Sequence, residues 1–272
     1  MTEPIGSSYH THSHYCDGQG QISEMIEAAI DAGLSEIGIS SHAPVPFATD
    51  WTIPPDRLAA YAAEVHELEQ RYRDRIKVRF GLEIDYIPHA EVAAFQQSMI
   101  FPLGFDYFVG SVHFLGHRYP PGDFDGSDQE FREILDEEYA GDIAAMVTDY
   151  YQRMSQVPTI PGVKIIGHLD RIKRWNAGHR YFSGDEPWYR EAVEQTLQSL
   201  ATFGTIVELN TSGWRNGLGE PYPSSAILAR CGELGIPITI NSDAHTPGDV
   251  VAGFDQAHTL LADLGIVPVR LT

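Results

Sequence analysis

Short apolar runs along the chain alternate with longer segments in which apolar residues repeat at helical spacing. The short runs have few polar positions and many β-branched residues, which is typical of strands buried on both faces. The longer segments place apolar residues three and four positions apart, which predicts amphipathic helices. This alternation recurs about seven times, so the sequence predicts parallel strands connected by helices.

The bounds of the predicted elements follow from the same pattern. Strands are expected at SEIGISSH, KVRFGLEID, FDYFVGSVHFL, VKIIGHLD, IVELNTSG and PITINSDAH, and a short strand is expected to end at the motif YHTHSHYCDG. Helices are expected over 23–32, 55–72, 89–99, 129–157, 188–204, 224–235 and 249–264. Segments 116–128 and 173–187 are irregular and rich in glycine, proline or polar residues, and we expect them to be loops.

Residue types that bind metal ions recur where the predicted strands end. They are His10, His12, His14, Asp17, His42, Glu83, His113, His168, Asp243 and His245. Strand ends converge on one mouth in a closed β/α barrel, whereas an open doubly wound sheet gathers only the strands near its switch point. Ligands from so many strands therefore favour a closed barrel. Imidazoles and carboxylates suit zinc, iron or manganese, and this number of ligands predicts two or three ions, as in metal-dependent hydrolases.

Two of the motifs place a pair of ligands on the same side of the chain. His10 and His12 form an H-x-H pair, and side chains two positions apart in a strand point the same way. Asp243 and His245 repeat this spacing, although Asp243 could instead cap a turn while His245 faces solvent. A carboxylate at Glu83, at the end of its strand, could bridge two ions.

The first motif contains two candidates for one further ligand. His14 continues the alternation of His10 and His12, while Asp17 lies on the turn made by Gly18. We favour Asp17 as the ligand and expect His14 to line the pocket. The remaining histidines have no predicted strand before them and are expected at the surface: His66, His89, His117, His179 and His258.

Charge, apolar runs and cysteine content exclude several classes of protein and of binding partner. The formal net charge is −20 and the pI is about 4.8, which disfavours a nucleic-acid surface or an anionic membrane as partner. No apolar run is long enough for a membrane span, and the first residues, MTEPIGSS, do not resemble a secretory signal. Cys16 and Cys231 lie far apart, which argues against a disulfide framework and fits the cytoplasm. We expect one domain over residues 1–272.

Basic residues are scarce, so their concentration after two of the strands is informative. Arg215 follows IVELNTSG, while Arg171, Lys173 and Arg174 follow the strand that bears His168. A guanidinium can bind two phosphate oxygens at once, so these side chains are candidates for holding a phosphate ester. The alternative is that some of them pair with nearby acids, such as Asp170 or Glu220.

The motifs HTHSHYCDG, SH, GLE, SVH, GHLD and SDAH, in this order and spacing, resemble those of the polymerase-and-histidinol-phosphatase (PHP) superfamily. The longer strings GSVHFLG, GHLDRIKRW and VELNTSGWRNG resemble the monofunctional histidinol-phosphate phosphatases within it. The resemblance implies a distorted seven-stranded β/α (TIM-like) barrel with a trinuclear metal site. It also implies hydrolysis of L-histidinol phosphate to L-histidinol and phosphate in histidine biosynthesis.

The resemblance also implies which residues hold each ion. His10, His12, Glu83 and Asp243 would hold the first ion, and Glu83 would bridge to a second ion completed by His113 and His168. Asp17, His42 and His245 would hold the third. Glu83, Asp243 and His245 are thus the expected catalytic residues, and a hydroxide generated by the metal ions would be the nucleophile. Either His245 or a metal-bound water could protonate the leaving alkoxide.

Two other functions remain open from the sequence. One is a PHP phosphoesterase that acts on a different phosphate ester or on a nucleotide, and the other is a non-catalytic metal-stabilised module, which the complete ligand set disfavours.

For histidinol phosphate, an acidic rim would attract the ammonium group of the substrate, and aromatic residues of the two irregular loops could form a ring-sized pocket. These aromatic residues are Tyr119, Phe124, Trp175 and Tyr181. The sequence does not predict the oligomeric state.

Overall fold

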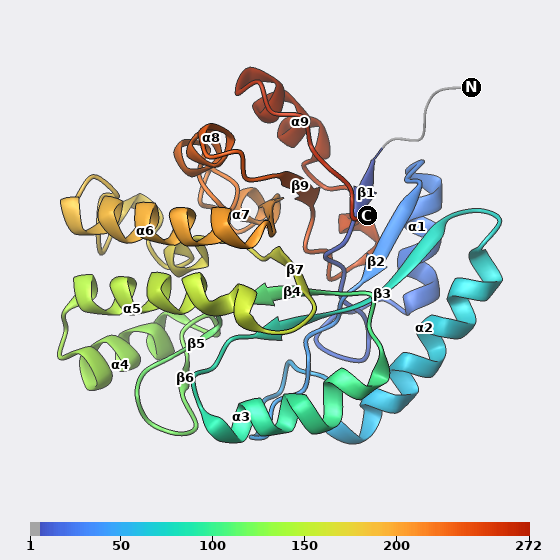
Figure 1. The fold of residues 1–272 in the computed structure, drawn as a ribbon, viewed down its shortest axis with the longest axis horizontal. Coiled ribbons are helices and arrows are strands. Elements are labelled where there is room, and N and C mark those ends of the chain that lie inside the picture. Colours follow the sequence, from blue (N-terminus) through green and yellow to red (C-terminus); the bar gives the residue numbers. More distant parts are fainter. Residues whose placement is uncertain (1–5) are drawn as a thin grey trace.

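The computed structural model describes residues 6–272, so residues 1–5 of the MTEPIGSS segment and of the predicted domain lie outside it. Seven parallel strands form one sheet in which every strand pairs with the next in chain order (Figure 1). They are β1 (Ser7–Ser8), β2 (Glu36–Ile39), β3 (Lys77–Asp85), β4 (Tyr107–Ser111), β7 (Val163–Ile166), β8 (Ile206–Asn210) and β9 (Ile238–Asn241).

The two edges of the sheet meet just beyond β1 and β9. Thr11 and Ala244 form a parallel bridge, in which the His12 amide donates to the Ala244 carbonyl at 2.8 Å. The Tyr9 amide donates to the Asn241 side chain at 2.8 Å. The sheet is therefore a nearly closed, distorted barrel joined by few hydrogen bonds along this seam. The predicted seven-stranded β/α barrel is confirmed.

Helices surround the barrel on its outside (Figure 1). They are α1 (Ile22–Asp31), α2 (Leu58–Tyr72), α3 (Ala90–Phe95), α4 (Asp128–Tyr139), α5 (Ile143–Gln156), α6 (Pro187–Phe203), α8 (Ser225–Glu233) and α9 (Phe254–Asp263). The short helix α7 (Ser212–Arg215) lies instead at the barrel mouth, directly after β8. In α1, a capping box between Gln21 and Glu24 opens the helix, and the apolar positions at helical spacing are buried against the barrel. No helix within residues 6–272 is long and apolar enough to cross a membrane.

One large cluster of buried apolar side chains extends from Tyr15 to Leu261. It includes side chains of β2, β3, β8 and β9 and the inner faces of the helices around them. Such a continuous core is what we expect of the one domain predicted for residues 1–272.

The long helix predicted over 129–157 is wrong. The chain forms α4 and α5, which are separated at Ala140 and Gly141, both with positive φ. A left-handed residue ends a helix, and the Asp142 side chain then caps α5 by accepting from the Ala145 amide at 3.1 Å. The apolar spacing is helical on both sides of this break, which is why periodicity alone did not show it.

The strand predicted over 105–115 and the loop predicted over 116–128 are also only partly right. β4 ends at Ser111, and Phe114–Leu115 (β5) then pairs antiparallel with Gly122–Asp123 (β6). The chain therefore forms a small hairpin beside the carboxyl ends of the barrel strands instead of one long strand and a loop. This hairpin, β5–β6, brings residues 123–126 to the barrel mouth.

Replacing Ala140 by Gly is expected to increase the free energy of unfolding by up to about 1 kcal/mol. Ala140 is exposed and has φ 52°, a conformation that costs a non-glycine residue roughly 1–2 kcal/mol, whereas the added chain entropy of glycine costs about 0.4–1 kcal/mol. Urea denaturation measures the change. Ala63→Gly, at an exposed position inside α2, is the matched control and should lower stability. A less stable Ala140→Gly variant would contradict this account of the break.

Candidate metal centre

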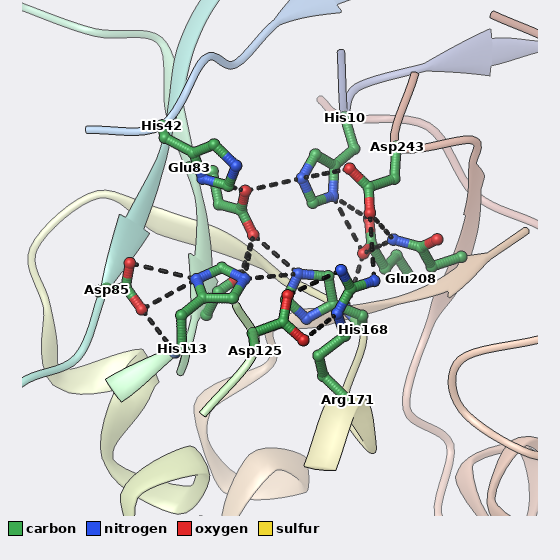
Figure 2. Close-up of polar contacts among 12 residues, drawn as sticks. His10, His42, Glu83, Asp85, His113, Asp125, His168, Arg171, Glu208 and Asp243 are labelled. Atoms are coloured by element: carbon green, nitrogen blue, oxygen red, sulfur yellow. Dashed lines mark hydrogen bonds and ion pairs between the residues drawn. The ribbon is translucent and has the colours of Figure 1, made fainter. Parts of the chain in front are cut away.

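Predicted ligands from different strands converge at the carboxyl ends of the barrel strands; Figure 2 shows His10, His42, Glu83, His113, His168 and Asp243. All but Asp17, which lies on a turn, come from within a strand or from the few residues after one, so the barrel itself sets where their side chains point. His10, His12, Glu83 and His168 are at most 1% exposed. His42 and Glu83 lie opposite one another in a parallel bridge, which brings ligands of neighbouring strands together.

Glu83 lies at the middle of this cluster (Figure 2). Its Oε2 is 3.1 Å from His10 Nε2 and 2.9 Å from His42 Nδ1. Its Oε1 is 2.9 Å from His168 Nε2 and 3.6 Å from His113 Nε2. The two carboxylate oxygens therefore face two different sets of imidazoles, which is the arrangement expected of a carboxylate shared between two ions.

Several buried polar atoms of the cluster make no hydrogen bond within residues 6–272, although some lie close to one another: His10 Nε2, His12 Nε2, His42 Nδ1 and Glu83 Oε2. A buried polar atom without a hydrogen bond costs roughly 1–3 kcal/mol, so four of them together need an explanation. Four sets of ligand atoms lie within 4.8 Å of one another: His12–Asp17–His42–His245, His10–His168–Asp243, His10–His12–Glu83 and His42–Glu83–His113. Bound metal ions would satisfy these atoms, and the nitrogen and oxygen donors suit zinc, iron or manganese.

Asp17, and not His14, joins the cluster. The Asp17 carboxylate is 3.3 Å from His245 Nε2 and 3.7 Å from His42 Nε2. Burial raises the pKa of Asp17, but the His42 imidazole and a hydrogen bond with His245 lower it further, so the ionised form is favoured. The His14 ring instead packs on Tyr15, with ring centroids 4.4 Å apart.

The histidines expected at the surface lie away from this cluster. His66, His117, His179 and His258 are exposed, and His89 is half-buried.

The cluster forms the floor of a cavity of about 560 Å³. Three arginines line it: Arg171, Arg174 and Arg215. Its wall is otherwise largely acidic and includes Asp50, Asp123, Asp125, Glu130 and Asp249, together with Trp51. A basic patch beside the proposed ions and an acidic wall around it suit a substrate that carries both charges.

Comparison with known proteins agrees with this geometry. The PHP domain family matches residues 8–212. The chain belongs to the PHP family. It is 32% identical over 259 residues to a Deinococcus radiodurans protein named "Probable histidinol-phosphatase", covering 94% of this chain and 92% of that one. It is 28% identical over 255 residues to the histidinol-phosphatase of Bacillus subtilis, covering 89% of this chain and 94% of that one.

Solved structures show the same barrel fold. A Listeria monocytogenes protein superposes with a TM-score of 0.82 at 23% identity, covering 92% of this chain and 99% of its own. The histidinol phosphate phosphatase of Lactococcus lactis, solved with zinc, L-histidinol and phosphate, superposes with a TM-score of 0.72 at 24% identity. That comparison covers 97% of this chain and 95% of the Lactococcus chain.

Asp125 holds two of the arginines in this PHP site. It accepts from Arg171 Nε and Nη2, both at 2.8 Å (Figure 2), and from Arg174 Nη1 at 2.9 Å. Arg215 instead donates to the carbonyls of Ser242 and Asp243 at 2.8 and 3.0 Å. Sequence reasoning missed Asp125, because only the hairpin β5–β6 brings it to the barrel mouth.

Lys173 does not line the cavity, in contrast to its prediction as a phosphate ligand. Its ammonium pairs with Asp170 at 3.2 Å and with Glu220. The alternative of pairing with nearby acids therefore holds for this residue. Burial lowers the pKa of Lys173, but these acids raise it further, so the ion pair persists at neutral pH.

The aromatic wall of the cavity also differs from the prediction. Within the described residues, Tyr119, Phe124, Trp175 and Tyr181 are absent from the lining, and Phe124 is fully buried beneath Trp175, which donates to its carbonyl at 3.0 Å. Trp51, from the loop after β2, lines the cavity instead. Its ring centroid is 4.6 Å from that of His42.

Two buried carboxylates behind the ligands were also missed. Asp85 accepts from the His113 backbone amide at 2.7 Å and contacts His113 Nδ1 at 3.1 Å. Glu208 lies in β8 and contacts His10. Both are acids inside apolar strands, and Asp85 lies two residues after Glu83, on the same side of β3. The two-residue spacing of Glu83 and Asp85 in this strand could have indicated that Asp85 also faces the site.

Proposed function

We propose that this PHP protein is a metal-dependent phosphatase that hydrolyses L-histidinol phosphate to L-histidinol and phosphate, a reaction of histidine biosynthesis. The observation that carries the proposal is the buried cluster of imidazoles and carboxylates, several of whose atoms make no hydrogen bond, at a cavity that arginines also line. Relatives that cover most of both chains are named histidinol-phosphatase, which supports the choice of substrate. We also propose that the enzyme works in the cytoplasm.

The proposed ligand assignment is the one that the resemblance to the PHP superfamily implies. The contacts of Glu83 with His10, His113 and His168, and of Asp17 with His42 and His245, support it. We propose that His10, His12, Glu83 and Asp243 hold one ion, and that Glu83 is shared with a second ion held also by His113 and His168. A third is proposed at Asp17, His42 and His245. When bound, such ions act as Lewis acids that polarise phosphoryl oxygens and lower the pKa of water towards about 7. Glu83, Asp243 and His245 are therefore proposed as the catalytic residues.

The arginines are proposed to hold the phosphate. Asp125 occupies one edge of the Arg171 guanidinium, and Nη1, which donates to Ser212 Oγ at 3.5 Å and lies 3.8 Å from Asp243 Oδ2, faces the ligand cluster. Arg174, held by the same carboxylate, lines the cavity beside it. Arg215 lines the same cavity. The positive charges of the three arginines would stabilise the charge on the phosphate oxygens in the transition state.

The acidic wall is proposed to bind the cationic part of the substrate. Asp123 accepts from Trp51 Nε1 at 2.9 Å and from the amides of Asp125 and Gly126 at 2.9 and 3.0 Å. It has no basic side chain as partner within residues 6–272, so its charge is available to an ammonium or imidazolium group. Phosphate at the metal end and a cation at the wall would match histidinol phosphate.

A panel of phosphate esters tests the proposed function. Purified, metal-loaded enzyme is assayed with histidinol phosphate, p-nitrophenyl phosphate, a nucleoside monophosphate and a nucleotide diester. We expect kcat/KM for histidinol phosphate to exceed the other values by a large factor. Equal values for histidinol phosphate and p-nitrophenyl phosphate would instead indicate a general PHP phosphoesterase, and preference for a nucleotide would overturn the substrate assignment.

Arg215→Ala is expected to raise KM for histidinol phosphate and to lower kcat, with a combined loss in kcat/KM of about tenfold. A hydrogen bond to a charged group contributes roughly 1.5–3 kcal/mol, but Arg171 and Arg174 would still bind the phosphate group of the substrate. Steady-state kinetics with the loaded enzyme measure the effect. Arg73→Ala removes an exposed arginine outside the cavity and is the control. Unchanged kinetics for Arg215→Ala would remove this residue from the proposed clamp.

A further inference from the structure

Glu208 is a buried carboxylate in the middle of β8, directly behind the ligand cluster (Figure 2). Its exposure is 0%, and its strand neighbours Val207 and Leu209 are also fully buried. It belongs to none of the four sets of ligand atoms that could hold an ion. A buried carboxylate is costly unless its charge is compensated by hydrogen bonds, so its partners indicate what it does.

Every partner of Glu208 is a hydrogen-bond donor or can act as one. Its Oε1 accepts from the His168 amide at 2.7 Å and from Asn210 Nδ2 at 2.7 Å. Its Oε2 accepts from Asn241 Nδ2 at 2.8 Å. His10 Nδ1 lies 3.1 and 3.0 Å from the two oxygens. One carboxylate therefore connects residues of four segments of the barrel, those of β1, β7, β8 and β9.

Only an ionised carboxylate satisfies this set of donors. Its two oxygens offer about four acceptor positions, whereas a glutamine amide offers one oxygen and would direct its own NH₂ group at another donor. With an ionised acceptor at Nδ1, the neutral His10 ring carries its proton on Nδ1 and the lone pair on Nε2. That Nε2 faces Glu83 Oε2 at 3.1 Å and Asp243 Oδ1 at 3.6 Å.

We propose that Glu208 is a positioning residue of the metal centre. It fixes the tautomer and the ring orientation of His10, and through the backbone amide it places His168, so that both imidazoles present Nε2 to the ions. The inference rests on the proposed metal site but not on the identity of the substrate. Carboxylates that orient metal-binding histidines typically contribute 10–100-fold to metal affinity.

A purely structural role is the competing explanation, because Glu208 also supports the barrel seam. The Asn241 side chain donates to Glu208 through Nδ2 and accepts a hydrogen bond from the Tyr9 amide through Oδ1, across the gap between β9 and β1. Loss of Glu208 could therefore lower stability without any specific effect on metal binding. The test must separate the affinity of the folded protein for metal from the fraction that is folded.

The experiment compares Glu208→Gln with Glu36→Gln in otherwise intact protein. Glu36 is a matched control, because it is also a buried carboxylate that accepts from side-chain donors, Tyr9 and Arg79, but in the amino-terminal part of β2. Metal-free protein is unfolded in urea to measure stability. Zinc affinity is then measured by competition with a chromophoric chelator, without substrate.

We expect Glu208→Gln to weaken zinc binding about 10–100-fold, whereas Glu36→Gln loses stability but keeps its zinc affinity within about twofold. Zinc affinity of Glu208→Gln within twofold of the wild type, or a loss no larger than the unfolded fraction explains, would overturn the proposal. Because substrate is absent, this outcome is independent of the phosphate-ester panel.

A second variant keeps the test decisive if Glu208→Gln does not fold. Glu208→Asp keeps the negative charge among the donors but withdraws it from His10 by about one C–C bond length. We expect a folded protein whose zinc affinity is reduced at least about fivefold. Wild-type zinc affinity in Glu208→Asp would overturn the proposed control of His10.

Discussion

Replacing Glu83 by Gln is expected to lower kcat for histidinol phosphate by about 10³-fold or more and to remove at least one bound ion. Glu83 faces imidazoles on both sides, so its loss would affect both proposed ions that share it. Charge stabilisation by a metal ion contributes several kcal/mol, and each 1.4 kcal/mol corresponds to about tenfold in rate. An amide keeps the shape of the side chain but supplies one neutral oxygen ligand.

Kinetic assays and elemental analysis of the metal-loaded variant measure this prediction. Glu220→Gln is the control, since Glu220 pairs with Lys173 outside the cavity and its loss removes the same charge. A Glu83→Gln enzyme with a full complement of ions and a kcat within tenfold of the wild type would show that this carboxylate is not shared between ions.

Asp123→Asn is expected to lower kcat/KM for histidinol phosphate by about 10–100-fold and to leave that for p-nitrophenyl phosphate nearly unchanged. A hydrogen bond between charged groups contributes roughly 1.5–3 kcal/mol, and only histidinol phosphate has a cation for the acidic wall. Glu133→Gln, an exposed change of equal charge on α4, is the control. A parallel decrease for both substrates would place Asp123 in the catalytic machinery instead of in substrate selection.

The Asp123 carboxylate also predicts how KM for histidinol phosphate depends on pH. Burial, and then the charge of Asp125, raises the pKa of Asp123 to about 6. Its negative charge is therefore present above pH 6 and is lost as the pH falls, so KM for histidinol phosphate should rise between pH 7 and 5. In Asp123→Asn this rise should be smaller, because only the titration of the substrate's own phosphate and imidazole remains. Because the folded-state pKa exceeds the unfolded value, ionised Asp123 destabilises the fold, and metal-free Asp123→Asn should be more stable than metal-free wild type at pH 8.

The strands and the clustering of the proposed ligands could be predicted from the sequence, because both depend on local patterns. The H-x-H pair at His10 and His12 and the carboxylate at Glu83 follow from the period of two within strands, and a parallel barrel brings strand ends together. Asp125 and Trp51 could not be predicted, because their positions depend on how the hairpin β5–β6 and the loop after β2 fold over the mouth. Lys173 was misassigned for a similar reason, since its choice between phosphate and Glu220 depends on contacts distant in sequence.

The seam between β1 and β9 has a consequence for how a cell makes this enzyme. Tyr9 and Asn241, which join across the seam, are 232 residues apart, and the proposed ligands His10 and Asp243 lie close to them in sequence. During synthesis the first histidines leave the ribosome long before the aspartate that would complete their proposed ion site. With this assignment a nascent chain has no finished centre, and full loading with metal must follow translation of the last strand. Mature enzyme will thus depend on the metal supply that released chains meet.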